Sequence, residues 1–377
     1  MKYYIIAGEA SGDLHGANLI RQLKQLDAGA QCRVWGGDLM QAAGGELRKH
    51  YRDLAFMGFV EVLKNLRTIL RNLAFCKQDI LDFQPDTLVL IDYPGFNLRI
   101  AKWARQQGLR VVYYISPQLW AWHASRVYDI KKFVHKMLVI LPFEPDFYQK
   151  YNYNVTFVGH PLLDVIEQFE PDTKFLQKHH LDERPIIALL PGSRKQEISR
   201  MLEVMLTVVP YFADYQFVIA GAPAQPKSVY QSILVKSPSV RVQLVENQTY
   251  NLLSYARAAL VTSGTATLET ALFNVPEVVC YKGSALSYLI AKNLIGSRIQ
   301  FISLVNLIVG RLLVQELIQH ELTPANLRQS LLQILDAKQT AAIQQGYATL
   351  RQQLGNTGAS ERAAQAIYRF VQSAASD

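Results

Sequence analysis

The N-terminal segment of the chain combines a short β-rich run with a glycine loop. Residues Lys2–Ala7 read KYYIIA, the loop follows at Gly8–Asp13, and a helical pattern starts near Leu14. Strand–loop–helix units of this kind recur along the first half of the sequence, and they predict a parallel sheet covered by helices on both faces. Further strands are expected at Arg33–Gly36, Thr87–Ile91, Arg110–Ile115, Lys136–Ile140 and Asn154–Phe157, with helices at Leu14–Leu26, Ile69–Phe83 and Leu98–Gln107.

The same pattern restarts at Arg184–Leu190, which predicts a second domain. The chain of 377 residues also exceeds the roughly 250–300 residues that one core usually serves. The expected fold class is therefore α/β, with Rossmann-like domains at residues 1–168 and 169–354 and the polar segment Glu167–Glu183 as the linker. A break at Gly355–Gly358 precedes a C-terminal helical segment, 355–377. The other expected elements are helices Glu197–Val208, Asn326–Ala337, Thr340–Leu354 and Ala359–Ala374, and strands Gln216–Ala220, Val240–Val245, Ala259–Val261 and Glu277–Tyr281.

Composition narrows the class of partner. The net charge of +8 and the sequence pI near 9.2 favour phosphate-bearing partners or an anionic membrane face. The basic residues are scattered and form no arginine-rich tail, so nucleic acid is the least favoured of these and is not expected. No His, Asp, Glu or Cys residues show metal-ligand spacing, and we expect neither a metal nor a cofactor.

The chain reads as a cytosolic protein. Its first residues lack a signal-peptide pattern, and no segment reaches the ~18 uninterrupted apolar residues of a membrane span. Cys32, Cys76 and Cys280 lie far apart in the sequence and are expected to be reduced thiols.

The opening loop can bind an anion. Its residues Gly8, Glu9, Ser11, Gly12 and Asp13 precede a helix, and free backbone N–H groups at a helix N-terminus suit a phosphate. The same spacing also fits a tight strand-to-helix turn with no ligand, because it matches neither standard glycine-rich phosphate motif.

The second domain repeats this arrangement at Gly192, Ser193 and Arg194. A strand ends there, a helix follows, and the planar guanidinium of Arg194 suits a diphosphate. We favour a ligand over a solvated arginine on a turn.

A second loop, with Ser263, Gly264 and Thr265, follows the expected strand Ala259–Val261. Open α/β sheets bind ligands at such strand ends. Glu269, near the first turn of the next helix, can accept the two hydroxyls of a ribose, or it can simply compensate the helix dipole.

Three segments of the first half carry further polar or aromatic candidates. Asp92 follows the buried strand Thr87–Ile91 and can act as a general base, although a turn or N-cap aspartate fits equally well. Trp120 and Trp122 can line a sugar site or fill a core. His160 can bond a ligand, whereas a lone histidine is more often structural.

The segment Phe56–Phe75 is apolar with basic residues among its apolar ones. A helix with an apolar face and basic flanks can rest on an anionic bilayer, and it can equally pack on a core. The residues expected to meet a membrane are Phe59, Val62, Leu63, Leu66, Ile69 and Leu70.

Taken together and in this order, a set of sequence stretches spanning nearly the whole chain resembles lipid-A-disaccharide synthase. Each stretch alone would be a weak match. They are AGEASGD (7–13), MGFVEVL (57–63), IDYPGFN (91–97), SPQLWAW (116–122), LPFE (141–144), VGHPLLD (158–164), LLPGSR (189–194), SGTATLE (263–269) and LVNLIVGR (304–311).

The resemblance implies a GT-B fold, in which two Rossmann-like domains face each other across a cleft and the C-terminal helix crosses back to the first domain. It implies an inverting transfer from UDP-2,3-diacylglucosamine to 2,3-diacylglucosamine 1-phosphate, giving a β-1,6-linked disaccharide 1-phosphate and UDP. Arg194 and the loop amides can stabilise the departing diphosphate without a metal. The enzyme would be peripheral on the cytoplasmic face of the inner membrane. The sequence does not give the oligomeric state, although an exchanged C-terminal helix would be compatible with a homodimer.

The resemblance also distributes the candidate residues. Asp92 becomes the general base, and Arg194, Glu269, Asn306 and Arg311 match positions on the UDP side. The loop Gly8–Asp13 moves to the acceptor side, with Trp120 and His160. Some family members carry an acid after the proline of the IDYPGFN run, where this chain has Gly95, so Asp92 is the only carboxylate in that run.

Two other functions stay open at this level. A UDP-N-acetylglucosamine 2-epimerase-like enzyme would share the fold, but it would leave the apolar Phe56–Phe75 segment without a role. A non-catalytic module that binds nucleotide or membrane would keep its function when Asp92 is replaced.

Overall fold

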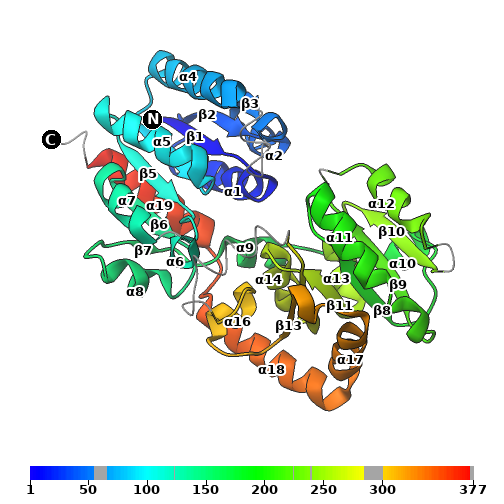
Figure 1. Cartoon of the computed structure of the whole chain (residues 1–377). Coiled ribbons are helices and arrows are strands. Elements are labelled where there is room, and N and C mark those ends of the chain that lie inside the picture. The colour runs from blue at the N-terminus through cyan, green and yellow to red at the C-terminus, as the bar shows by residue number, and fades with distance from the viewer. Residues whose placement is uncertain (55–65, 123, 224, 238–239, 284–299, 374–377) are drawn as a thin grey trace. The chain divides into compact units, whose positions relative to one another are not determined.

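The computed structural model describes residues 1–54, 66–122, 124–223, 225–237, 240–283 and 300–373 (Figure 1). The chain divides into two compact units. The first comprises Met1–Asp164 and Asn356–Asp377, and the second comprises Val165–Gly355.

The described part of the first unit contains a seven-stranded sheet in the order β3-β2-β1-β4-β5-β6-β7. Every neighbouring pair in it is parallel. The central strands are buried along their length, as expected for a parallel sheet with helices on both faces. The strands are β1 (Lys2–Ala7), β2 (Gln31–Gly36), β3 (Glu46–His50), β4 (Thr87–Ile91), β5 (Val111–Tyr114), β6 (Lys136–Val139) and β7 (Thr156–Phe157).

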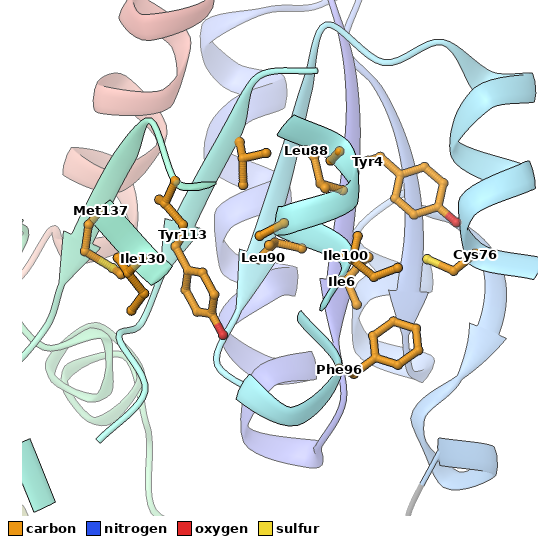
Figure 2. Close-up of a cluster of buried hydrophobic side chains, with 14 of the residues drawn as sticks. Tyr4, Ile6, Cys76, Leu88, Leu90, Phe96, Ile100, Tyr113, Ile130 and Met137 are labelled. Carbon is orange, nitrogen blue, oxygen red and sulfur yellow. The ribbon is translucent and has the colours of Figure 1, made fainter. Parts of the chain in front are cut away.

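The helices of the first unit follow its strands, as the sequence pattern predicts. Alternate residues of neighbouring strands form one core face, and Figure 2 shows Ile6, Leu90 and Tyr113 on it among side chains from the covering helices. The helices are α1 (Ala10–Leu26), α2 (Asp38–Ala42), α4 (Leu66–Phe83), α5 (Pro94–Gln106), α6 (Leu119–Trp122), α7 (Val127–Phe133), α8 (Glu144–Gln149), α9 (Pro161–Glu167), which runs into the second unit, and α19 (Ala359–Gln372), with 3₁₀ turns at Tyr51–Leu54 and Ala124–Arg126.

The second unit repeats this architecture. Its described residues form a six-stranded sheet in the order β10-β9-β8-β11-β12-β13, and all neighbouring pairs are parallel. The strands are β8 (Ile186–Leu190), β9 (Gln216–Gly221), β10 (Val242–Glu246), β11 (Ala256–Thr262), β12 (Glu277–Tyr281) and β13 (Gln315–Ile318). The helices are α10 (Phe175–Lys178), α11 (Lys195–Leu206), α12 (Lys227–Leu234), α13 (Thr249–Tyr255), α14 (Thr265–Leu272), α16 (Leu304–Val309), α17 (Pro324–Leu335) and α18 (Ala337–Gln353), with 3₁₀ turns at Val209–Tyr211 and Gln319–Glu321.

The expected α/β class with two Rossmann-like parallel sheets is confirmed, and several local expectations need correction. Helix α1 begins at Ala10, so Ser11, Gly12 and Asp13 are helical and the loop shortens to Gly8–Glu9. Strands β3 and β13 were not expected, because both are short, lie at sheet edges and carry charged residues. The segment expected as a linker is packed: Phe175 is buried in the second core and its ring stacks on Tyr255.

The C-terminal helix α19 belongs to the first unit, where it packs on α1. Ala363, Ala364 and Ile367 are buried on its inner face. At its C-terminal end the Arg110 guanidinium donates to the carbonyls of Phe370 and Val371. A cation at the C-terminal carbonyls of a helix also interacts favourably with the helix dipole.

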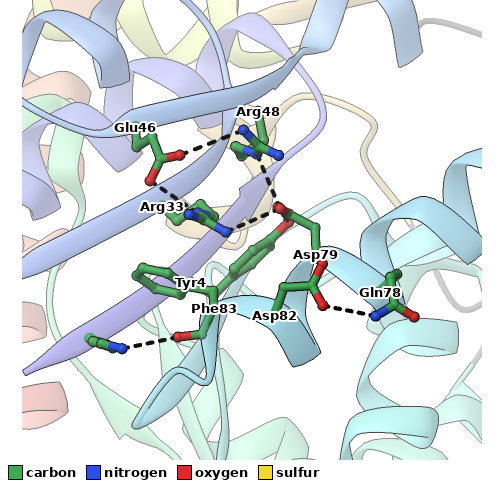
Figure 3. A network of polar contacts seen from close by, with 9 residues as sticks. Tyr4, Arg33, Glu46, Arg48, Gln78, Asp79, Asp82 and Phe83 are labelled. Atoms are coloured by element: carbon green, nitrogen blue, oxygen red, sulfur yellow. Dashed lines mark hydrogen bonds and ion pairs between the residues drawn. The ribbon is translucent and has the colours of Figure 1, made fainter.

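A polar network fixes α4 against the edge of the first sheet (Figure 3). Asp79 of α4 is buried and accepts hydrogen bonds from Tyr4 Oη at 2.7 Å, Arg33 at 3.2 Å and Arg48 at 3.1 Å. The two arginines also bind Glu46 of β3. A buried carboxylate needs such partners, so the network determines where α4 lies on β1, β2 and β3.

Candidate active site

Both sheets have a topological switch point. In the first sheet, β1 and β4 are neighbours and the chain continues in opposite directions from them, and β8 and β11 play the same part in the second sheet. Open α/β sheets bind ligands beyond the carboxyl ends of the strands at such points. The loops after β1 and β4, and those after β8 and β11, are therefore the places to look for a site.

Asp92 and Tyr93 leave β4 in an unusual backbone conformation. Their φ angles are +43° and +50°, a left-handed region that non-glycine residues seldom occupy. The Asp92 carbonyl accepts hydrogen bonds from Tyr113 Oη at 2.5 Å and from Asn97 Nδ2 at 2.8 Å, which hold this turn in place. Strained backbone of this kind clusters at functional sites, because the surrounding contacts must maintain it.

The loop after β1 lies directly against this turn. A Cβ atom at Gly8 would overlap the Tyr93 ring, so only glycine allows the two loops to approach this closely. Glu9 follows Gly8 directly in this loop, and its negative charge raises the pKa of Asp92. The structure thus brings Gly8 and Glu9 together with Asp92.

The environment of Asp92 suits a general base. Burial, and to a smaller extent the charge of Glu9, raise its pKa to about 7, while a backbone hydrogen bond at Tyr93 lowers it. A carboxylate that titrates near neutral pH accepts a proton more strongly than an ordinary aspartate and is still ionised in part.

Two of the expected acceptor-side residues are buried and already bonded. The Asp13 carboxylate accepts from the backbone N–H groups of Gly37, Leu39 and Met40, at 2.7–3.2 Å, and so caps the start of α2. His160 is buried, and its Nδ1 accepts from the backbone N–H of Leu162 at 3.2 Å. Burial and the neighbouring His15 lower the pKa of His160 to about 3, so it stays neutral. Both side chains stabilise the first unit, and their contact with the acceptor stays a prediction.

The remaining first-unit candidates divide by exposure. Ser11 is exposed on the first turn of α1, whereas Gly12 packs against Ala7. The Trp120 ring meets Phe143 edge-on, with 5.1 Å between the ring centroids, so it is part of a local aromatic contact. The side chain of Trp122 lies outside the described residues.

Sequence reasoning missed a buried acid beside this site. Glu144, at the start of α8, is 1% exposed and accepts hydrogen bonds from the backbone N–H groups of Ile140 and Leu141. The charge of Asp92 contributes to its raised pKa. Its only signal in the sequence is the LPFE stretch at residues 141–144, which contributes to the family resemblance.

In the second unit, the loop after β8 is built around Gly192. Its φ is +109°, and a Cβ atom there would overlap the Glu197 carboxylate, which accepts a hydrogen bond from Ser193 N at 3.0 Å. Gln225 donates to the Ser193 carbonyl at 3.0 Å and ties the loop after β9 to it. Arg194 is exposed at the N-cap of α11.

The loop after β11 carries Ser263, Gly264 and Thr265. Ser263 Oγ donates to the Ile302 carbonyl at 3.1 Å, and Gly264 and Thr265 are exposed. Glu269 lies one turn into α14 and accepts from Tyr250 Oη at 2.8 Å, which occupies one carboxylate oxygen. Burial raises the pKa of Glu269.

Asn306 and Arg311 differ sharply in their surroundings. Asn306 is fully buried: its Nδ2 donates to Val314 O and Glu316, and its Oδ1 accepts from two backbone N–H groups. These bonds tie Asn306 into its own loop, and its assignment to the UDP side stays a prediction. Arg311 follows Gly310, is exposed, and forms no ion pair with any residue that the structure describes.

The expected membrane segment is described only in part. Phe59, Val62 and Leu63, and the side chain of Leu66, lie outside the described residues. On α4, Leu70 is 54% exposed, and Ile69 is partly buried against the core. None of the helices in the described ranges is long and apolar enough to cross a membrane. The same ranges hold no cluster of three metal-binding side chains.

The sequence model of one family, described as lipid-A-disaccharide synthetase, matches residues 3–370. The curated lipid-A-disaccharide synthase of Syntrophus aciditrophicus is 41% identical over 366 residues, covering 96% of this chain and 95% of the relative. That of Coxiella burnetii is 37% identical over 375 residues, covering 97% and 98%. The chain belongs to the lipid-A-disaccharide synthase family. Like its family, it is a glycosyltransferase of lipid A biosynthesis.

Solved structures place this family member in the GT-B fold class. The UDP-GlcNAc 2-epimerase of Neisseria meningitidis, bound to UDP-GlcNAc, has a TM-score of 0.69 at 14% identity, covering 98% of this chain and 100% of that chain. CalG4, the calicheamicin glycosyltransferase, has a TM-score of 0.59 at 16% identity, covering 99% of both chains. At these identities the likeness concerns the fold alone, so it gives the epimerase alternative no support as an activity.

Proposed function

We propose that this glycosyltransferase moves 2,3-diacylglucosamine from UDP-2,3-diacylglucosamine to the 6-hydroxyl of 2,3-diacylglucosamine 1-phosphate. The products are the β-1,6-linked disaccharide 1-phosphate and UDP. Membership of the family supports this reaction. The observation that carries the mechanism is Asp92, a half-buried carboxyl group with a pKa near 7 at the end of β4.

The first unit supplies the base for the transfer. The Asp92 carboxylate removes the proton of the acceptor 6-hydroxyl as that oxygen attacks the anomeric carbon of the donor. The bond from that carbon to the UDP oxygen breaks, and its electron pair leaves with UDP. Attack on the face opposite the leaving group inverts the configuration. Gly8, Glu9 and Ser11 are proposed to border the acceptor.

The second unit supplies the stabilisation of the leaving group. UDP departs with negative charge developing on its diphosphate, which cations and backbone N–H groups stabilise. Gly192, Ser193 and Arg194 after β8, the Ser263–Thr265 loop after β11, and Arg311 are proposed to contact UDP. Glu269 is proposed to accept a ribose hydroxyl through the oxygen that Tyr250 does not occupy. None of these steps requires a metal.

Both substrates carry acyl chains, which supports a role at the cytoplasmic face of the inner membrane. On α4, exposed Leu70 lies between exposed Arg67 and Arg71. An apolar side chain flanked by cations can insert its apolar part while the guanidinium groups meet anionic headgroups. We propose this face of α4 as part of the membrane contact.

The reaction is tested by incubating the purified protein with both substrates and measuring disaccharide and UDP together. Equal amounts of both products are expected, with activity retained in EDTA. Asp92→Asn is expected to lose at least a hundredfold in kcat while binding UDP normally, because amide nitrogen and oxygen cannot take up the proton. Exposed Asp146→Asn is the matched control. UDP release without disaccharide, or an active Asp92→Asn enzyme, would contradict the proposal.

A further inference from the structure

Glu144 is one of the most buried acids of the first unit, and the mechanism above does not use it. Its side chain is 1% exposed and turns back toward the end of β6. Its Oε2 accepts from Leu141 N at 2.8 Å and from Ile140 N at 3.2 Å. The carboxyl group thus closes the turn between β6 and α8.

The same turn is connected to the end of β5. Tyr148, one helical turn after Glu144, brings its Oη to 2.6 Å from Ser116 Oγ, and the Ser116 hydroxyl also interacts with Glu144. Ile115, between β5 and Ser116, has a φ of +64°. A β-branched residue in the left-handed region is strained, so its neighbours must hold it there.

The end of β5 is in turn bonded to Asp92. Tyr113, the third residue of β5, donates its hydroxyl to the Asp92 carbonyl at 2.5 Å. Strands β4, β5 and β6 are neighbours in the sheet, so their carboxyl ends meet at one edge. Glu144 is therefore connected to the proposed base by two sets of hydrogen bonds that the backbone from Tyr113 to Ser116 joins.

We propose that Glu144 is a positioning residue for the transfer: its carboxyl group holds the ends of β5 and β6 in place beside Asp92. This proposal rests on the role of Asp92 given above. Glu144 does not touch the substrate in it. The residue acts by fixing the positions of its neighbours. Because Glu144 stays protonated, Asp92 is the group of this pair that carries the negative charge.

The charges around the pair support a proton on Glu144. Burial raises the pKa of Glu144 to about 8, and the charge of Asp92 adds to this, while the two backbone N–H groups and Ser116 lower it. Besides burial, the charge of Glu144 raises the pKa of Tyr148, and that of Glu9 raises the pKa of Asp92. Burial raises the pKa of Tyr113, and the charge of Arg126 lowers it in part. Two like charges at one buried site are unfavourable, so Asp92 and Glu144 titrate as a coupled pair. Once one of the two carboxyl groups has lost its proton, its charge opposes ionisation of the other.

The pH dependence of kcat separates positioning from simple folding support. Glu144→Gln keeps the shape and the two acceptor bonds but cannot ionise. Its kcat at pH 7 is expected within about threefold of wild type. Above pH 8, wild-type Glu144 ionises and kcat falls, whereas the variant stays flat, so their ratio should rise at least fivefold by pH 9.5. Parallel profiles would overturn the proposal.

A second variant distinguishes an effect on kcat from an effect on protein stability alone. Tyr148→Phe keeps the ring and removes the bond to Ser116, and it is expected to lower kcat about tenfold with UDP affinity and melting temperature unchanged. Unchanged kcat would also reject the network. Asp92→Asn, measured alongside, separates the two proposals. If Asp92→Asn remains active, the assignment of the base fails. If Asp92→Asn is inactive but the pH profiles of wild type and Glu144→Gln have the same shape, positioning by Glu144 fails.

Discussion

The carboxylate of Asp164 accepts a hydrogen bond from the backbone N–H of Gly358 at 2.5 Å, although 194 residues separate them. The same carboxylate accepts from Ala359 N and Ser360 N. Asp164 is the last residue of the first segment of the first unit, and Gly358 precedes α19. Because Gly358 has no side chain, Asp164 supplies the N-terminal cap of α19 from a distant part of the chain.

Asp164→Ala is expected to loosen the start of α19. Removing a helix cap costs roughly 1–2 kcal/mol, and here three N–H groups lose their acceptor. Hydrogen exchange at Gly358, Ala359 and Ser360 should accelerate, and the melting temperature should fall. Exposed Asp146→Ala on α8 serves as the control. Unchanged protection of the three amides would show that the cap contributes nothing.

Glu9→Gln is expected to shift the acid limb of kcat to lower pH. The charge of Glu9 raises the pKa of Asp92, so removing that charge lowers the pKa and keeps Asp92 ionised in more acidic solution. For the wild-type enzyme, the midpoint of the acid limb of kcat should lie near pH 7. The measurement is kcat between pH 5 and 8, with exposed Glu246→Gln as control. A limb that moves upward or stays in place would contradict the electrostatic contact.

Gly192→Ala is expected to weaken UDP binding at least tenfold. A methyl group would overlap the Glu197 carboxylate, and the φ of +109° is unfavourable for alanine. The loop would have to open, which displaces the backbone N–H groups proposed to meet the diphosphate. Calorimetry with UDP gives the affinity. Gly95→Ala is the matched control, since its Cβ would meet nothing within 4 Å. Equal UDP affinities of the two variants would show that this loop does not bind UDP.

Glu277→Gln is expected to stabilise the protein above neutral pH. Glu277 is fully buried, and both its oxygens lack a partner among the described residues. Burial, and then the charge of Glu316, raise its pKa well above the ordinary value. Its contribution to stability is therefore complete below the unfolded pKa of about 4.3 and is lost as pH rises through the folded pKa, at up to ~1.4 kcal/mol per pH unit.

This dependence can be measured by denaturant unfolding of wild type and Glu277→Gln between pH 5 and 9. The difference in unfolding free energy should grow with pH in favour of the variant. Exposed Glu246→Gln should give no such trend. A difference that stays constant with pH would show that Glu277 keeps the same protonation in both states.

Leu70→Glu is expected to reduce binding to vesicles that contain anionic lipid. Leu70 is 54% exposed, and a carboxylate in its place would be repelled by the headgroups and could not insert. The control is Leu332→Glu on α17, where the leucine is 51% exposed in the second unit. Co-sedimentation with vesicles measures both. Equal binding of the two variants would reject this face of α4 as a membrane contact.

Much of the candidate site could be predicted from the position of residues along the chain. A strand followed by a loop and a helix is a local pattern, so Asp92 after β4 and Gly192 after β8 could be assigned to the carboxyl edges of parallel sheets. The same reasoning placed the Ser263–Thr265 loop. The hydrogen-bond partners were not predicted: Asp13 accepts from N–H groups at the start of α2, and Asn306 bonds within its own loop.

The sequence by itself determined the alternation of strands and helices, the two parallel sheets and the family. Each follows from hydrophobic periodicity or from runs of residues in order along the chain. Only the tertiary structure decided which acidic side chains are buried and which groups lie next to them. Burial raises the pKa of Glu144 to about 8, because packing removed water from its carboxyl group. Asp164 caps a helix whose N-cap residue Gly358 is 194 residues away, because packing brought those backbone N–H groups to its carboxylate. Desolvation and partner geometry depend on segments far apart in sequence, and no local pattern records them.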